Sequence, residues 1–162
     1  MSRSAAYVEG LKMLARRELS EQQVRQRLAR KEHDAGDIDA AVARLRGERA
    51  IDDARVAEAI ARRETAIRRL GRLRVRMQIE RAGIEKSVAR GALDAVFGAI
   101  DSGELLEAAL QKRLRGRTRV DDVRELQRLH RFLLAQGFEA DRVMQRLRRL
   151  KVRLKPDTTD VD

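Results

Sequence analysis

The sequence predicts an all-α fold of tandem three-helix repeats, in which three units form an elongated, curved helical array. The chain of 162 residues is 39% charged and 2% aromatic, and its hydrophobic share of 43% is mostly Ala, Leu, Val and Ile. This composition, with a single proline, favours helices over sheets. Apolar residues also recur with helical spacing, and one turn pattern returns about every 50 residues.

The first unit is expected over residues 1–50 and contains three short helices. In "LSEQQV", the side chains of Ser20 and Gln23 can form a capping box, which marks the start of the second helix. Asp37 can cap the third helix, which is expected to end at Gly47. The three apolar faces are formed by Tyr7, Leu11 and Leu14, by Val24 and Leu28, and by Ile38, Val42 and Leu45.

The second unit is expected over residues 51–102. Its first helix begins in "IDDARVA", where Asp52 can accept hydrogen bonds from free backbone N–H groups and Asp53 meets the positive end of the helix dipole. Gly71 is expected to end this helix. The first and third apolar faces are formed by Val56, Ile60, Ile67 and Leu70, and by Val88, Ala92, Val96 and Ile100.

The segment "RLRVRMQIE", residues 72–80, has two readings. Its alternation of polar and apolar residues is typical of a half-buried strand, but a lone strand would leave its backbone groups without partners. Val75, Ile79 and Ala82 have the spacing of a helical face. We therefore expect a helix that Gly83 closes.

The third unit is expected over residues 103–155. Lys155 and Pro156 are expected to end its last helix, and the acidic tail at 156–162 is expected to be disordered. The three apolar faces are formed by Leu106, Ala109 and Leu110, by Val123, Leu126, Leu129 and Leu133, and by Val143, Leu147, Leu150 and Leu154.

One turn pattern recurs in each of the three units. It is "AGDIDAAVARL" from Ala35, "AGIEKSVARGAL" from Ala82 and "QGFEADRVMQRL" from Gln136. Glycine accepts the left-handed backbone that ends a helix, and an acid in the next first turn complements the helix dipole. Since three short helices bury little surface alone, the repeated units are expected to stack on one another.

No catalytic, cofactor or metal site can be located in the sequence. There is no cysteine, and His33 and His130 lie far apart without a cluster of acids around them. Asp52 and Asp53 would point about 100° apart on a helix, so a helix start explains them better than a catalytic or metal-binding pair. We expect a protein that is not an enzyme and needs no cofactor.

The cellular setting follows from segments that are missing. The N-terminal residues lack the apolar core of a signal peptide, and no segment approaches the roughly 20 apolar residues of a transmembrane helix. We expect a cytoplasmic protein, a monomer, with no membrane partner. Its net charge of +11 favours a polyanion or an acidic protein surface as the partner.

Two basic clusters form the candidate surface for such a partner. Residues 62–81 hold eight arginines and two glutamates, and residues 142–155 hold seven basic residues and no acid. Either cluster can instead be a solvated helix face. Arginine pairs bidentately with carboxylates and phosphates, and scarce aromatics make any DNA affinity electrostatic. The candidate residues are Arg62, Arg63, Arg68, Arg69, Arg72, Arg74, Arg76, Arg146, Arg148 and Arg149.

Several segments match a known family in their order and spacing. They are "LARRELSEQQVRQRLARKE", "IDDARVA" from Ile51, a pattern that starts at Gly71 and continues as "RVRMQIERAGI", and "RFLLAQGFEADRVMQRL". Together they resemble the RecX family of bacterial regulators of the RecA recombinase. Val56 and Ile60 stand where the family usually has aromatic rings, and Gln78 replaces an acid.

The resemblance implies an array of three-helix units that binds the RecA filament on single-stranded DNA. It also implies that the protein restrains filament growth, ATP hydrolysis, strand exchange and coprotease activity in DNA repair and the SOS response. The residues themselves indicate a helical, repetitive and basic protein, but they do not indicate RecA. The alternative is a basic helical DNA-binding or architectural protein that acts without RecA.

Overall fold

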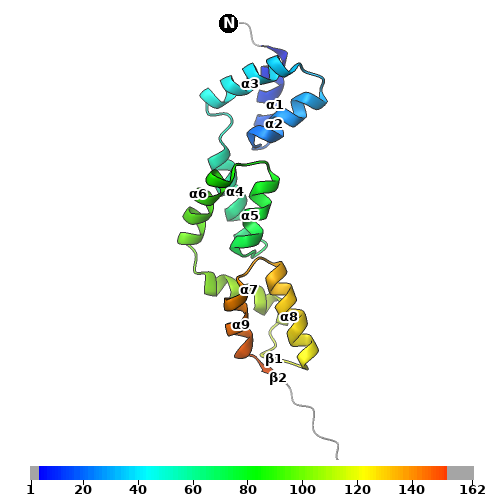
Figure 1. Cartoon of the computed structure of the whole chain (residues 1–162), viewed down its shortest axis with the longest axis vertical. Coiled ribbons are helices and arrows are strands. Elements are labelled where there is room, and N and C mark those ends of the chain that lie inside the picture. The colour runs from blue at the N-terminus through cyan, green and yellow to red at the C-terminus, as the bar shows by residue number, and fades with distance from the viewer. Residues whose placement is uncertain (1–3, 153–162) are drawn as a thin grey trace, which may run out of the picture.

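The computed structural model describes residues 4–152, and the helices within that range follow one another in an elongated array (Figure 1). The all-α class of three-helix repeats is confirmed. The tail at 156–162, Leu154 and the helix end at Lys155 and Pro156 lie outside the described residues. The helices are α1 (Ala5–Arg16), α2 (Glu21–Arg30), α3 (Ala35–Gly47), α4 (Asp53–Ala66), α5 (Arg72–Arg81), α6 (Lys86–Gly98), α7 (Ser102–Leu114), α8 (Val123–Ala135) and α9 (Ala140–Arg148).

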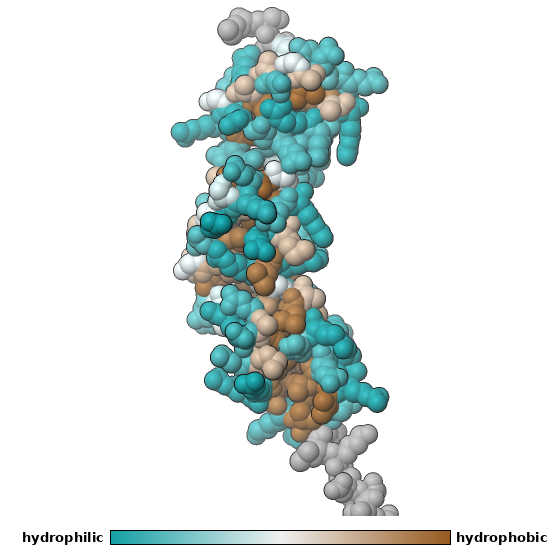
Figure 2. Space-filling view, in the orientation of Figure 1, coloured by the Kyte–Doolittle hydropathy of each residue, from teal (hydrophilic) through white to brown (hydrophobic). Residues whose placement is uncertain are grey.

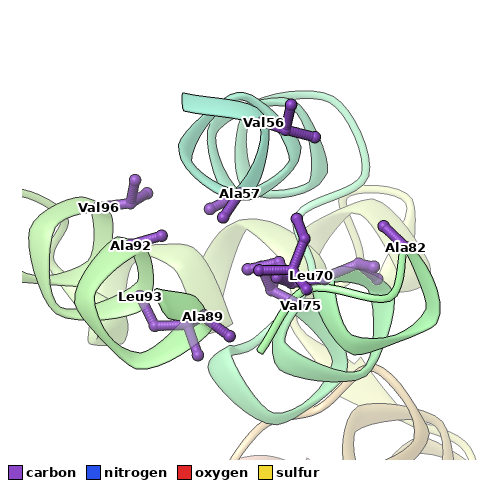
Figure 3. Packing of buried hydrophobic residues seen from close by; sticks show 12 residues of the cluster. Val56, Ala57, Leu70, Val75, Ala82, Ala89, Ala92, Leu93 and Val96 are labelled. Carbon is purple, nitrogen blue, oxygen red and sulfur yellow. The ribbon is translucent and has the colours of Figure 1, made fainter. Parts of the chain in front are cut away.

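Buried apolar side chains form three clusters in chain order, and we refer to α1–α3, α4–α6 and α7–α9 as the first, second and third units. In the second unit, side chains from α4, α5 and α6 converge, among them Ala57, Val75 and Ala92 (Figure 3). Phe97 and Ile100 pack against both the second and the third cluster. The apolar interior is therefore continuous across the junction of these two units.

Several expected helix boundaries are confirmed. Ser20 Oγ accepts a hydrogen bond from Gln23 N at 3.2 Å, and Gln23 Oε1 accepts one from Ser20 N at 3.0 Å, which forms the capping box of α2. Residues 72–80 are helical in α5, where Val75 and Ile79 are fully buried. Gly83 follows this helix with φ of 77°.

Helix α4 ends earlier than its apolar spacing indicated. It stops at Ala66 because Arg69 takes a left-handed backbone with φ of 53°, and Leu70 N bonds to Glu64 O at 3.1 Å. Ile67 was expected on the buried face, but 66% of it is exposed. Gly71 does not end α4, since it is the N-cap residue of α5.

The end of the third unit also differs from the prediction. Helix α9 stops at Arg148, and the next residues form a strand, β2 (Lys151–Val152), that pairs in parallel with β1 (Arg119–Val120). Two-residue strands carry no alternation that a sequence can display. Val123 was expected on the buried face of α8 but is 59% exposed.

The repeated turn lies four residues earlier in the first unit than the glycine pattern indicated. In the second and third units, Gly83 and Gly137 have φ of 77° and 94° in the turn before the last helix. The residue at this position in the first unit is Glu32, with φ of 63°. Asp34 is therefore the N-cap of α3, and Asp37 lies in its first turn rather than at the cap.

Hydrophilic side chains cover most of the face that Figure 2 shows, and apolar side chains reach this surface mainly in the middle and at the lower end. The large apolar residues that are exposed within residues 4–152 are Ile67, Leu73, Met77, Val123, Leu134 and Met144. Hydrophilic residues therefore cover more of this face than apolar residues do.

Candidate partner-binding site at the unit junctions

Successive units meet at equivalent positions, through a side-chain hydroxyl at the first junction and a backbone N–H group at the second. At the first junction, the hydroxyl of Ser20 at the start of α2 donates to the carbonyl of Ala82, in the turn before α6. At the second junction, Gly71 N at the start of α5 donates to Gln136 O at 2.8 Å, in the turn before α9. The start of the second helix of one unit therefore contacts the next unit at the turn that precedes its last helix.

The two turns approach the preceding unit so closely that only glycine fits. A Cβ atom on Gly83 would lie 1.9 Å from Gln22 Oε1 of α2. A Cβ atom on Gly137 would lie 2.3 Å from Arg74 N of α5, and one on Gly71 would lie 2.5 Å from the carbonyl of Gly137. The close contacts are with the Gln22 side chain at the first junction and mainly with backbone atoms at the second, and they hold each unit against the next.

The adjacent aspartates lie at helix starts. Asp52 is the N-cap of α4, and its carboxylate accepts a hydrogen bond from Arg55 N at 3.0 Å. The carboxylate of Asp53 accepts from Glu21 N at 2.9 Å and thereby bonds the first turn of α2 in the first unit. Asp122 caps α8 in the same way as Asp52 caps α4. The sequence had indicated the helix starts but not the bond from Asp53 to the first unit.

We expect Asp52→Ala to lower the free energy of unfolding by about 1 kcal/mol, the usual effect of losing an N-cap. Urea denaturation followed by circular dichroism measures this change. The matched control is Asp34→Ala, because Asp34 is the N-cap of α3 but makes no side-chain capping bond. Equal losses in the two variants would show that the carboxylate of Asp52 contributes nothing as a cap.

A basic pocket lies at the second junction. It has a volume of about 890 Å³ and lies between the end of α4 in the second unit and the ends of α7 and α8 in the third. Six of its nine lining residues are basic and none is acidic. We refer to it as the cationic pocket, and it is lined by Arg68, Arg69, Ala109, Lys112, Arg113, Arg115, Arg117, Phe132 and Gln136.

Few carboxylates neutralise the cationic pocket. Arg117 pairs with Glu125 at 2.5 Å and with Asp121 at 3.5 Å, and Arg68 pairs with the buried Glu64 at 3.2 Å. In the part of the chain that the structure describes, no carboxylate pairs with the other four cations, which are Arg69, Lys112, Arg113 and Arg115. Four positive charges thus remain free to bind an anion.

A second pocket at the same junction has balanced charges. It has a volume of about 490 Å³ and is lined by residues of the second and third units. Arg72 pairs there with Asp94 at 2.5 Å, and Arg142 pairs with Glu139 at 3.6 Å. Of these two pockets, only the cationic pocket carries an excess of positive charge.

The ten arginines selected from the sequence do not share one surface. Arg68 and Arg69 line the cationic pocket, and Arg72 lines the balanced one. Arg74 is half-buried, with its backbone against Gly137. The remaining arginines of α4 and α5 are exposed and have nearby acids, with Arg62 on Glu58, Arg63 on Glu64 and Arg76 on Glu80.

The C-terminal candidates fall into two kinds. Arg146 donates two hydrogen bonds to Glu107 of α7, at 2.5 and 2.9 Å, and these bonds lower the pKa of Glu107 to about 2. This pair therefore joins α9 to α7 and stays ionised at neutral pH. Arg148 and Arg149 are exposed, and no carboxylate of residues 4–152 pairs with them. They are better placed to meet a partner than Arg146.

The sequence-based candidates omitted four basic residues of the cationic pocket, which are Lys112, Arg113, Arg115 and Arg117. They follow one another closely in "QKRLRGRTRV", residues 111–120, which holds five basic residues and no acid. This run was a signal that a charge count could have found. Nothing in the sequence indicated that this run lies beside Arg68 and Arg69 of the second unit, because that proximity depends on how the units stack.

The described residues contain no cluster with the composition of a metal site. Across residues 4–152, no three His, Cys, Asp or Glu side chains come together as metal ligands. Every buried polar side-chain atom in that range has a hydrogen-bond partner. No helix in the same range is long and apolar enough to cross a bilayer.

Comparisons with known proteins identify the family. The family model "RecX, first three-helix domain" matches residues 6–45. Regulatory protein RecX of Halorhodospira halophila is 34% identical over 134 residues, which are 82% of this chain and 80% of that protein. Regulatory protein RecX of Acidithiobacillus ferrooxidans is 35% identical over 139 residues, 83% of each chain.

Solved structures share the fold. The crystal structure of RecX from Lactobacillus salivarius has a TM-score of 0.70 at 21% identity, over 88% of this chain and 94% of that chain. A second crystal structure, of regulatory protein RecX, has a TM-score of 0.73 at 22% identity, over 88% of this chain and 70% of that one. The sequence relatives above are named as regulatory proteins rather than as enzymes. From its helical repeats and these relatives, the chain belongs to the RecX family.

Proposed function

We propose that this chain binds the RecA filament on single-stranded DNA and inhibits filament growth, ATP hydrolysis, strand exchange and coprotease activity. The observation that carries the proposal is the identity of 34–35% to proteins named regulatory protein RecX, over 82–83% of the chain. In this role the protein acts in the cytoplasm, in homologous recombination, DNA repair and the SOS response. It works as a monomer without catalysis or a cofactor.

The shape and charge of the chain support a filament as the partner. We take the units as residues 1–50, 51–102 and 103–155, and their helices α1–α3, α4–α6 and α7–α9 follow one another along an elongated body (Figure 1). A filament likewise presents the same protein surface at regular intervals. The net charge of +11 suits acidic protein patches and DNA phosphates, and we propose that the exposed Arg148 and Arg149 contact RecA.

A second candidate function is that of a DNA-binding or architectural protein that acts without RecA. The cationic pocket favours it, since this pocket lies on the chain itself and requires no protein partner to complete it. Retention of the chain on RecA filaments, compared with its retention on the same DNA without RecA, separates the two functions.

The test is RecA ATP hydrolysis on single-stranded DNA with this protein titrated in. We expect the wild type to lower the rate, and Arg148→Glu with Arg149→Glu to need about tenfold more protein for half the effect, because reversed charges repel an acidic surface. The control is Arg124→Glu with Arg128→Glu, another exposed pair of the third unit, which lies outside the cationic pocket. If the wild type leaves the rate unchanged, the proposed function is wrong. If the two double variants inhibit RecA ATP hydrolysis equally well, Arg148 and Arg149 do not contact RecA.

A further inference from the structure

We propose that the cationic pocket binds the phosphodiester backbone of a single-stranded nucleic acid. The proposal rests on the proposed function in one respect, because it names the group through which the chain itself touches the DNA of a filament. Binding to DNA alone tests it, so the pocket and the regulation of RecA can fail separately.

The charge of the pocket supports an anionic ligand. Basic side chains from the end of α4 face those from α7 and the residues after it, across the boundary between two units. Of the six cations, only Arg68 and Arg117 have carboxylate partners among the described residues. Like charges that converge without partners repel one another, and a row of phosphates removes this repulsion while it releases counterions.

The backbone at two of these cations supports a ligand as well. Arg69 and Arg115 have φ of 53° and 52°, a left-handed conformation that glycine or asparagine adopts with less strain. Each of them follows the first helix of its unit. Strained backbone of this kind is found more often at active sites and ligand-binding sites. Glu32 and Arg49 also have positive φ, of 63° and 58°, but do not line this pocket, so strain points to a ligand only where it coincides with the unpaired charges of the pocket.

The rest of the lining favours a phosphate backbone over a base or a protein. Only Ala109 and Phe132 are apolar among the lining residues, whereas protein interfaces usually have an apolar core. The guanidinium of Arg113 lies 4.9 Å from the centre of the Phe132 ring, which hinders a base from stacking on that face. Flexible basic side chains are the groups that follow a strand regardless of its sequence.

A smaller groove at the first junction lies in the corresponding place. It too lies where the first helix of one unit ends against the first two helices of the next, and Arg17, Arg63 and Arg81 contribute to its lining. Its lining also includes Glu18, which pairs with Arg55 at 2.5 Å. A strand in the cationic pocket therefore has a weaker basic groove one unit away.

The test measures the binding of a fluorescent oligothymidylate of about 20 nucleotides to the full chain by anisotropy over a salt series. The variant is Arg69→Asn with Arg115→Asn, because asparagine tolerates the left-handed backbone and leaves the fold intact. Each lost phosphate contact should reduce the salt slope by about 0.7 and weaken binding about eightfold at 50 mM salt. The melting temperature of the double variant should equal or exceed that of the wild type, because asparagine adopts the left-handed backbone with less strain than arginine.

The matched control is Arg49→Asn, which makes the same substitution in the same backbone conformation outside the pocket. It should bind the oligonucleotide as the wild type does. If Arg49→Asn weakens binding as much as one pocket substitution, the pocket is not the site. The proposal is also overturned if the wild type does not bind at 50 mM salt, or if polyglutamate of similar charge binds while the oligonucleotide does not. Binding to DNA with no effect on RecA would sustain the pocket and reject the proposed function.

Discussion

Gly137→Ala is expected to lower the free energy of unfolding by about 3 kcal/mol, from roughly 1 kcal/mol or more for a left-handed alanine and 1–3 kcal/mol for overpacking. Gly137 has φ of 94°, and its Cβ would lie 2.3 Å from Arg74 N and 2.9 Å from Arg74 Cα. These obstructing atoms belong to the backbone of α5, so no side-chain rotation can relieve the clash. The second junction must open or the turn must distort.

Urea denaturation of the full chain measures this loss, and Gly91→Ala is its control. Gly91 lies inside α6, and nothing is within 4 Å of its added Cβ, so alanine should stabilise the helix there by about 0.8–1 kcal/mol. Opposite signs for the two substitutions are the expected result. If the urea concentration at the midpoint of unfolding is the same for Gly137→Ala as for the wild type, the turn before α9 does not contact α5. Because the cationic pocket spans this junction, Gly137→Ala should also weaken DNA binding.

Features that depend on neighbouring residues could be predicted from the sequence. Ser20 and Gln23 predict the start of α2 because a capping box is complete within four residues. Asp52 and Asp122 mark α4 and α8 for the same reason. The helix at 72–80 required one further argument, that a lone strand would lack partners, and the structure bears this out. Apolar spacing failed only near helix ends, as for Ile67, where one left-handed residue outweighs periodicity.

Features that depend on how the units stack could not be predicted. The bond from Asp53 to Glu21 and the contact of Gly71 with Gly137 join residues far apart in the chain, so no local pattern signals them. The glycine pattern itself misled in the first unit, since Gly36 lies inside α3 and Glu32 makes the turn. The cationic pocket also depends on how the units stack. Its charges are visible in the sequence, but their convergence is a property of the junction.

The largest loss of stability in the third unit is expected from Leu133→Ala, at about 2–5 kcal/mol. Leu133 is fully buried in the cluster of α7, α8 and α9, where it packs among side chains such as Leu110, Leu129 and Val143. Removing three carbon atoms there costs the transfer free energy of those atoms and leaves a cavity that the backbone closes only in part. Thermal and urea unfolding of the full chain measure the loss.

The neighbouring residue supplies the control for Leu133→Ala. Leu134 is the same residue type on the same helix, but 37% of it is exposed. Leu134→Ala should therefore cost well below 1.5 kcal/mol, because much of its side chain already contacts water and alanine is the better helix former. Similar losses in the two variants would mean that α8 turns a different face to α7 and α9. Since α8 also carries Phe132 into the cationic pocket, such a rotation would dismantle the proposed DNA site as well.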